Sequence, residues 1–273
     1  MNLTEQEYEY IRKLVYQESR IDLGENKREL VTARLGKRLR ATGISDFPTY
    51  RKLLESKGAD GEMTHLIDAI STNHTFFFRE IKHFEFMRQV VLPAAVKGVP
   101  ETFRVWSAAS SSGEEPYSIA IDLDDFFRHQ PSWKWQIEAT DISTRILERA
   151  RAGIYPAERL RDVRPDWMPL YFQKGVGEYE GQFRLKAEVR RRVEFTHLNL
   201  LQPKYPFKDR FHMIWCRNVM IYFDRPTQEQ LVAQLSERLL PGGYLFIGHS
   251  ESLTGINHPL KALKPAIYQK AAA

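Results

Sequence analysis

The chain has 273 residues, of which 42% are hydrophobic and 27% charged, and its formal net charge is +5 at pH 7. This length suits one large domain or a medium domain with a small companion, and the composition is that of a soluble globular protein. No apolar run is long enough to span a bilayer, and the first six residues lack the pattern of a signal peptide. We therefore expect a cytoplasmic protein with no direct membrane insertion. The one cysteine, Cys216, excludes an internal disulfide and a cysteine-cluster metal site.

Apolar residues recur at helical spacing in the ranges 4–19, 27–42, 47–56 and 63–70, with a loop expected at 57–62. In the second range Val31, Leu35 and Leu39 form one apolar stripe. The same range is strongly basic, with a net charge of +5 from six basic residues and Glu29. The basic residues are Lys27, Arg28, Arg34, Lys37, Arg38 and Arg40. The pattern predicts a helical domain over residues 1–70 with a basic outer face.

From residue 71 to 273 the pattern changes to alternating strands and helices. We expect strands at 103–106, 135–140, 193–195, 211–216 and 243–247, and helices at 115–127, 143–152 and 227–239. This order is typical of an α/β fold with a mostly parallel, doubly wound sheet covered by helices on both faces. The range 162–192 breaks the alternation, because its turn glycines and the Phe183/Leu185 alternation indicate a small antiparallel insertion.

The stretch from Trp106 to Ala120, WSAASSSGEEPYSIA, has the shape of a ligand-binding strand, turn and helix. Small residues in the turn let a ligand approach the backbone. Glu114 and Glu115 at the helix start favour a ligand with cationic or hydroxyl groups over a dinucleotide pyrophosphate. The alternative is structural: Ser112 or Glu115 caps the helix, and small residues fill a tight turn.

Other candidate residues follow strand ends. Asp141 could hold a ribose diol or only cap the next helix. After the strand FHMIWC come Arg217, Asn218 and Tyr222, which could line a site, although Arg217 could also pair with an acid and Tyr222 could be a core aromatic. In STNHTFFFRE, residues 71–80, the aromatic triplet is expected to pack in the core, and Arg79 beside it is expected to bind an anion.

Several familiar chemistries are missing from the sequence. It has no GxSxG elbow, no GxxxxGK[ST] loop and no HExxH helix. The eight histidines are scattered along the chain without the close pairs of metal ligands, so we expect them to be structural or on the surface and predict no metal site.

Five strings together resemble the CheR-type chemoreceptor glutamate methyltransferases, which use S-adenosyl-L-methionine. They occur in the family's order and cover nearly the whole chain: STNHTFFFRE at 71–80, SSGEEPYSIA at 111–120, ATDIS at 139–143, CRNVMIYF at 216–223 and GHSES at 248–252. The resemblance implies transfer of the methyl group to glutamate carboxylates of chemotaxis receptors, with S-adenosyl-L-homocysteine as the product. One departure is visible, because many members have Gly-Cys where this chain has Ala109-Ser110; we expect a slightly changed loop and retained binding.

The resemblance also implies roles for individual residues. Arg79 and Tyr222 would position the reacting groups, with Tyr222 pointing toward the transferred methyl. Asn199 and Leu200 would flank the adenine. The full set of implied cofactor-binding residues is Asn73, Thr75, Arg79, Glu115, Asp141, Asn199, Leu200, Arg217 and Asn218. A substrate glutamate has a pKa near ~4.3 and is ionised at neutral pH, so no strong general base is needed.

The same resemblance implies the partners. The basic helix, through Arg34, Lys37, Arg38 and Arg40, would meet the acidic helices of the receptor's cytoplasmic helical domain. In a subset of members the β-insertion binds a peptide at the receptor's C-terminus, and Gly175-Val176-Gly177 matches the Gly-x-Gly turn of that subset. We expect a monomer.

Two other functions share these features. One is a nucleic-acid or small-molecule methyltransferase, although the localised charge disfavours a nucleic acid with its extended phosphate backbone. The other is a non-catalytic adapter that binds S-adenosyl-L-methionine. Transfer of labelled methyl to RNA alone would indicate the first, and cofactor binding without methylation would indicate the second.

Overall fold

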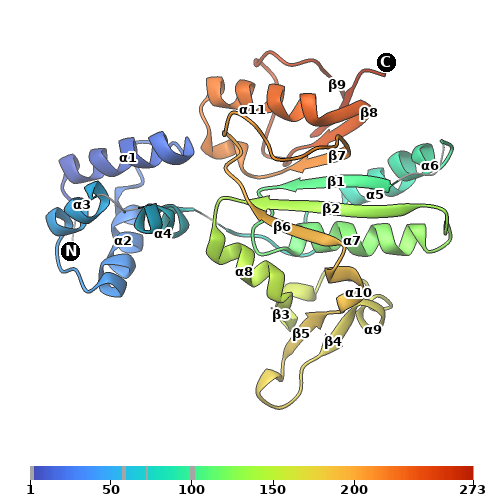
Figure 1. Ribbon diagram of the computed structural model, residues 1–273, viewed down its shortest axis with the longest axis horizontal. Coiled ribbons are helices and arrows are strands. Elements are labelled where there is room, and N and C mark those ends of the chain that lie inside the picture. The colour runs from blue at the N-terminus through green and yellow to red at the C-terminus, as the bar shows by residue number, and fades with distance from the viewer. Residues whose placement is uncertain (1–2, 57–59, 72, 99–101, 273) are drawn as a thin grey trace.

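The fold is an α/β sheet domain preceded by a helical unit (Figure 1). The computed structural model describes residues 3–56, 60–71, 73–98 and 102–272. Among these residues the main sheet has seven strands in the order β6-β2-β1-β7-β8-β10-β9. The first five are mutually parallel, and β10 and β9 close the sheet in antiparallel pairing. Their bounds are β1 Thr102–Ala108, β2 Lys134–Asp141, β6 Val193–His197, β7 Phe211–Cys216, β8 Leu239–Phe246, β9 Leu260–Lys264 and β10 Ile267–Lys270.

Helices cover both faces of this sheet, which confirms the predicted fold class. In Figure 1, α11 (Arg225–Arg238) lies above the sheet, and α7 (Glu114–Phe127) and α8 (Thr144–Ala152) lie below it. Side chains alternate along each strand, so Phe103 and Val105 of β1 belong to the α7 side while Trp106 and Ala108 belong to the α11 side. The α7 side also takes up three consecutive elements that the sequence pattern did not predict: α5 (Lys82–Phe86), the π-helix η1 (Met87–Val91) and α6 (Leu92–Ala95).

The helical unit has its own apolar core. It consists of α1 (Glu5–Ser19), α2 (Arg28–Thr42), α3 (Phe47–Glu55) and α4 (Asp60–Ile70). The predicted stripe of Val31, Leu35 and Leu39 is buried in this core. A capping box formed by Thr4 and Glu7 starts α1, and the Asp46 side chain caps α3.

The prediction of a loop at 57–62 is wrong for its second half. Helix α4 begins at Asp60, and residues 57–59 lie outside the described residues. The Glu62 carboxylate in the first turn accepts hydrogen bonds from Arg38 and from the Tyr50 hydroxyl. These tertiary contacts stabilise a first turn whose glycine, Gly61, suggested a loop. Thr72 of the STNHTFFFRE string also lies outside the described residues.

A small antiparallel sheet in the order β3-β5-β4 projects from the sheet domain (Figure 1). Its strands are β3 (Ile154–Pro156), β4 (Phe172–Lys174) and β5 (Gln182–Leu185), joined by the short helices η2 (Ala157–Leu160), α9 (Met168–Tyr171) and η3 (Gly177–Tyr179), with α10 (Ala187–Arg190) following. The predicted antiparallel excursion is therefore present, and β3 adds a strand that precedes Asp162. Within the described ranges, no helix combines the length and apolar composition that crossing a bilayer requires.

Candidate functional site

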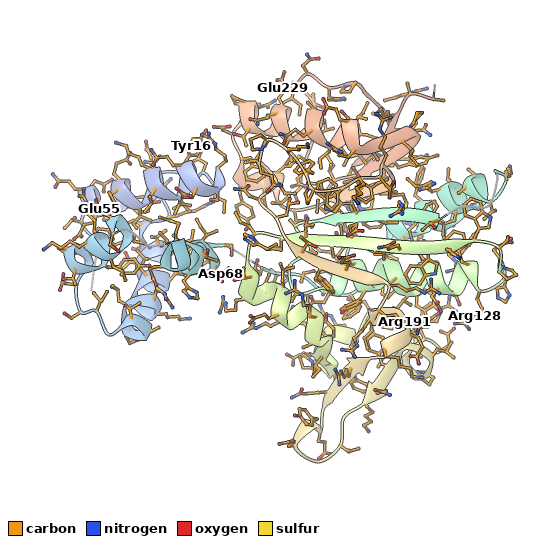
Figure 2. All side chains as sticks on the ribbon, viewed as in Figure 1. Tyr16, Glu55, Asp68, Arg128, Arg191 and Glu229 are labelled. Carbon is orange, nitrogen blue, oxygen red and sulfur yellow. The ribbon has the colours of Figure 1, made fainter. Side chains whose placement is uncertain are left out.

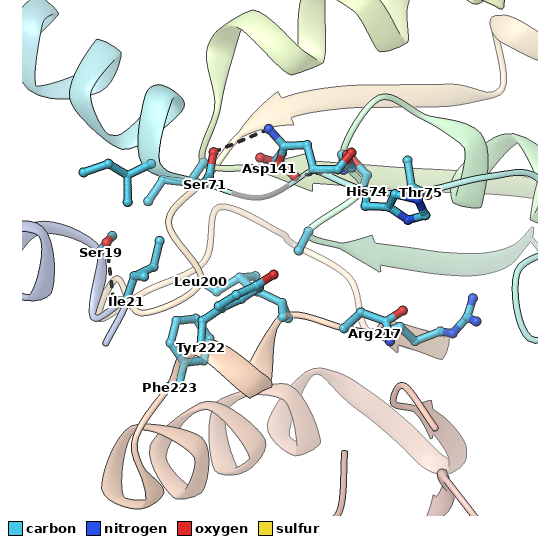
Figure 3. Close-up of a pocket in the computed structure, with 18 of the residues that line it drawn as sticks. Ser19, Ile21, Ser71, His74, Thr75, Asp141, Leu200, Arg217, Tyr222 and Phe223 are labelled. Carbon is cyan, nitrogen blue, oxygen red and sulfur yellow. Dashed lines mark hydrogen bonds between the residues drawn. The ribbon is translucent and has the colours of Figure 1, made fainter. Parts of the chain in front are cut away.

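One pocket lies where the carboxyl ends of β1, β2 and β7 face the helical unit, as expected for an open α/β sheet (Figure 3). Figure 3 shows Asp141, Ser71 and Thr75 on one side of it and Leu200, Tyr222 and Phe223 on the other. We call it the central pocket. All ten residues that were expected around a cofactor line it: Asn73, Thr75, Arg79, Glu115, Asp141, Asn199, Leu200, Arg217, Asn218 and Tyr222.

The turn after β1 lines the pocket with residues other than glycine, although two of them have the backbone conformation that favours glycine. Ala109 and Ser111 adopt positive φ values of 65° and 51°. This left-handed conformation costs non-glycine residues roughly 1–2 kcal/mol each. The Ser110 hydroxyl is buried and has no hydrogen-bond partner among the described residues. The turn therefore leaves one buried hydroxyl without a partner in the described part of the protein, at the wall of the central pocket.

The proposed capping of α7 by Ser112 or Glu115 is wrong. The N-cap is Gly113 at φ 96°, with no side-chain hydrogen bond to the helix start. A Cβ at Gly113 would lie 2.8 Å from the Tyr155 hydroxyl, so the close approach requires glycine. The Ser112 hydroxyl donates instead to a Glu114 carboxylate oxygen at 2.6 Å.

Glu115, in the first turn of α7, binds one side chain from β1 and one from the residue that follows β7. Its Oε1 accepts from the Ser107 hydroxyl at 2.9 Å, and its Oε2 accepts from Arg217 Nη1 at 3.0 Å. Burial raises the pKa of Glu115, although the Arg217 charge opposes that shift. A cation of the protein thus balances the Glu115 charge, so this carboxylate alone no longer indicates a cationic ligand.

Arg217 is the centre of a buried ion-pair network. Its side chain is 1% exposed, and its Nη2 lies 2.9 Å from Glu80 Oε2 as well as donating to the Arg79 carbonyl at 2.5 Å. Burial tends to raise the pKa of Glu80, but the Arg217 charge and hydrogen bonds from Arg217, Asn218 and His249 hold that pKa below its usual value. The expectation that Arg217 pairs with an acid is confirmed, and Arg217 lines the central pocket as well.

Asp141 ends β2 with both carboxylate oxygens anchored to the backbone. Oδ2 accepts from the Ser111 amide at 2.8 Å and Oδ1 from the Ser143 amide at 3.0 Å. Burial raises the pKa of Asp141, and these two N–H groups oppose the shift. The capping residue of α8 is Ser143, so the alternative that Asp141 only caps this helix is wrong. It ties the turn after β1 to the turn after β2 at the pocket wall.

The segment that joins the two units forms another wall. Phe77 and Phe78 are buried in the core as predicted, whereas Phe76 lines the pocket. Asn73 Nδ2 donates to the Ser71 hydroxyl at 3.4 Å, and Arg79 Nη1 donates to the His74 carbonyl at 3.0 Å.

Tyr222 lies at the end of the 3-10 helix η4 (Met220–Tyr222), under the helical unit. The Asp22 amide donates to its carbonyl at 2.8 Å, and Lys27 Nζ lies 5.6 Å from its ring centroid. Among the described residues its hydroxyl has no hydrogen-bond partner, and Figure 3 shows the ring inside the pocket. Tyr222 is therefore not a core aromatic.

The helical unit contributes a wall that the sequence did not reveal. Tyr16 at the end of α1 donates to Asp224 Oδ2 at 2.5 Å, and Asn199 Nδ2 donates to the Glu18 carbonyl at 2.9 Å. Figure 2 shows Tyr16 and Asp68 on the side of this unit that faces the sheet domain. Leu200 next to Asn199 is buried in the α11-side core. The pocket is thus closed by both units.

The four basic residues assigned to a receptor contact differ in their surroundings. Lys37 and Arg40 are exposed. Arg38 Nε donates to Glu62 Oε1 at 2.7 Å, and Arg34 Nη1 donates to the Ile70 and Ser71 carbonyls. Two of the four side chains therefore support the helical unit and the pocket wall.

The two glycines of the β-insertion also differ. A Cβ at Gly175 would overlap the Tyr179 carbonyl, whereas Gly177 has open space and a φ of 60°. Between them Val176 is 80% exposed. Glycine at 175 is required by the packing of the loop itself.

Two acidic residues near the site were missed, Glu80 and Glu251, although both belong to strings that were singled out. The histidines are less scattered than their sequence positions suggest, because His83 and His249 gather with Glu80, with candidate ligand atoms within 4.8 Å of one another. Burial and the Arg217 charge lower the pKa of His83 to about 3, so this side chain is neutral. The expectation of no metal site stays a prediction.

Comparisons with known proteins agree with this geometry. Residues 73–268 match the family model of the CheR methyltransferase, SAM binding domain, and residues 6–71 match that of the CheR methyltransferase, all-alpha domain. A chemotaxis protein methyltransferase of Escherichia coli K12 is 40% identical over 266 residues, which cover 97% of this chain and 91% of that protein. A chemotaxis protein methyltransferase of Borreliella burgdorferi is 39% identical over 275 residues, covering 99% and 96% of the two chains.

Proposed function

The chain belongs to the CheR methyltransferase family of S-adenosyl-L-methionine-dependent protein-glutamate O-methyltransferases, and we propose that its central pocket holds the methyl donor while its helical unit receives the receptor. The observation that carries this proposal is the convergence of ten residues from the joining segment, the start of α7, the ends of three strands and η4 on one pocket. The substrate we propose is the glutamate-bearing helices of a chemotaxis receptor's cytoplasmic domain.

The pocket has a donor and acceptor set that suits this cofactor. The Asp141 carboxylate accepts backbone N–H groups, and with about four acceptor directions it can also accept a ribose hydroxyl. The free Ser110 hydroxyl and the small residues beside it allow close approach of a polar group. Leu200 presents an apolar surface suited to adenine, and we assign Asn73, Thr75, Arg79, Arg217 and Asn218 to the methionine portion.

The protein's own task in catalysis is alignment. The methyl donor supplies a sulfonium methyl: a glutamate oxygen forms the new O–C bond while the C–S electron pair returns to sulfur, leaving S-adenosyl-L-homocysteine and a methyl ester. We assign Arg79 and Tyr222 to positioning the glutamate carboxylate, which is ionised at neutral pH. The helical unit covers the pocket, so the carboxylate loses water on entry and becomes more reactive.

The proposal is tested by transfer of labelled methyl from S-adenosyl-L-methionine to receptor signalling domains, with and without their C-terminal peptide. We expect base-labile methyl esters on glutamate. We also expect more rapid methylation at low receptor concentration when the peptide is present, because a tether raises the local receptor concentration. Label on RNA alone, or cofactor binding without any transfer, would contradict the proposed function.

The small sheet is the proposed peptide site. β4 is an edge strand of the order β3-β5-β4, and the loop after it carries the exposed Val176 and the half-exposed Tyr179. An edge strand can add an extended peptide through its unpaired backbone groups. Equal methylation of receptors with and without the peptide would remove this tether.

We further propose that the enzyme acts as a monomer in the cytoplasm, because one chain supplies every residue assigned to the pocket.

The exposed basic residues of α2 provide a second prediction. Reversing the charge of Lys37 and Arg40 together should lower kcat/KM for the receptor by about tenfold or more, because acidic receptor helices are then repelled. The affinity for S-adenosyl-L-methionine should not change. Reversal of Lys261 and Lys264, two exposed lysines of β9, is the matched control and should have little effect. Equal losses in the two double variants would remove α2 from the receptor interface.

A further inference from the structure

The GHSES string, residues 248–252, follows β8 and carries a buried acid without an assigned role. Glu251 is 9% exposed and lies beside the segment that leads from Arg217 to Tyr222. Among the residues assigned to the cofactor, the Glu251 side chain bonds only to Asn218, and it does so through the Asn218 backbone amide. Glu251 therefore contacts the backbone of the segment that carries the site residues.

One carboxylate accepts four backbone N–H groups. Oε1 accepts from Met220 at 2.7 Å and from Ile221 at 3.3 Å. Oε2 accepts from Asn218 at 2.9 Å and from Gly248 at 2.6 Å. Two of these donors, Met220 and Ile221, are the first residues of η4, where N–H groups have no partner within the helix, and Asn218 lies just before that helix. Glu251 satisfies them and links η4 to the turn after β8.

Only a carboxylate can complete this arrangement. Its two oxygens provide about four acceptor directions, whereas glutamine has one oxygen and would place an NH2 group against N–H donors. Each buried N–H left without a partner is costly. The turn is also closely packed, since a Cβ at Gly248 would lie 2.9 Å from the Asn218 amide nitrogen and 2.9 Å from Glu251 Oε2.

The four bonds fix two residues of the central pocket. Asn218 has a φ of 58°, a left-handed conformation that needs external support, and its side chain donates to Glu80 Oε1 at 3.3 Å. Tyr222 ends the single turn whose first amides Glu251 holds. We propose that Glu251 is a positioning residue for methyl transfer, which sets Asn218 and Tyr222 in the pocket. This inference rests on the proposed function of the pocket.

The test compares Glu251→Gln and Glu251→Asp with Glu237→Gln, the same change at an exposed position of α11. We expect Glu251→Gln to lower kcat by roughly 10²-fold, the scale of a displacement of about 1 Å, with a smaller change in receptor KM. Glu251→Asp keeps all four acceptor directions and should recover part of the loss. The control should match the wild type. Each variant is first checked by denaturant unfolding.

A double-mutant cycle separates positioning from general support. If Glu251 acts through Tyr222, the effects of Glu251→Gln and Tyr222→Phe on kcat should be strongly non-additive. Additive effects, a kcat within about threefold of the wild type, or a variant that no longer folds would each overturn the proposal.

Amide exchange gives a readout that does not depend on activity. In Glu251→Gln, deuterium uptake should increase in residues 218–221, and unchanged uptake there would contradict the proposal. A wild-type enzyme that methylates no receptor would instead contradict the proposed function, and the exchange result would still decide the role of Glu251.

Discussion

Replacing Arg217 with methionine should destabilise the protein by about 3–5 kcal/mol, the usual cost of leaving a buried charge without its partner. Methionine fills much of the same volume but leaves Glu115 and Glu80 facing each other in a buried site. It also removes a donor to the Arg79 carbonyl. We therefore expect loss of both cofactor affinity and methyl transfer, with the free energy of unfolding as the primary measurement.

The pH dependence of that loss identifies its cause. Burial already raises the pKa of Glu115 in the presence of Arg217, and removing the cation should raise it further. The folded variant then binds more protons than its unfolded chain, so its free energy of unfolding rises as the pH falls. The difference between wild type and variant should be largest near neutral pH and should shrink toward about pH 5. A difference that does not vary with pH would mean that lost packing, not charge, causes the effect.

Two further variants complete this comparison. Arg28 pairs with Glu5 at the surface, with 50% of its side chain exposed, so Arg28→Met should cost less than about 1 kcal/mol. Adding Glu115→Gln to Arg217→Met should recover part of the stability, because one uncompensated charge is removed. A loss for Arg217→Met as small as that of Arg28→Met would contradict a central role for the buried network.

The location of the site could be predicted because its residues follow strand ends. Asp141 ends one parallel strand and Arg217 directly follows another, and the carboxyl ends of such strands meet at one edge. The family strings then supplied Asn73 and Thr75, which belong to a connecting segment without a periodic pattern. Strand-end positions therefore indicated where the pocket lies, and the family resemblance was needed to name the residues outside them, including Asn199 and Leu200.

The partners of those residues could not be predicted. Arg217 pairs with Glu80 and Glu115, which are far from it in the sequence, and no local pattern indicates that either acid has Arg217 as its partner. For the same reason Arg38 was assigned to an outer face, although it bonds to Glu62 of a neighbouring helix. Charges pair according to tertiary packing, which a one-dimensional pattern does not contain.

The backbone conformation around the pocket could not be predicted from the sequence either. Ala109, Ser111 and Asn218 adopt left-handed φ values that sequence rules reserve mainly for glycine. At Ser111 the amide is held by Asp141, and at Asn218 it is held by Glu251. Conformations that depend on a distant carboxylate carry no local signal. They lie around the central pocket, where strain of this kind is commonly found.

Replacing Tyr222 with phenylalanine should lower turnover by roughly 10²-fold while leaving cofactor affinity within a fewfold of the wild type. The ring and its surroundings remain, since the carbonyl of Tyr222 still accepts from the Asp22 amide and Lys27 still lies over the ring. Only the hydroxyl is lost, and in the described residues it supports no other protein group. Its removal should therefore affect the alignment of the reacting groups rather than the fold.

The measurement combines single-turnover methyl transfer with calorimetry of S-adenosyl-L-methionine binding. Tyr179→Phe, at a half-exposed tyrosine of the small sheet, is the matched control when the receptor lacks its C-terminal peptide, and it should behave like the wild type. A Tyr222→Phe enzyme that binds cofactor weakly but turns over normally once saturated would move Tyr222 from the reacting groups to the cofactor. Because Tyr222 lines the central pocket and its helical-unit contacts use its carbonyl and its ring, lost turnover with normal cofactor affinity would assign its hydroxyl to the reacting groups.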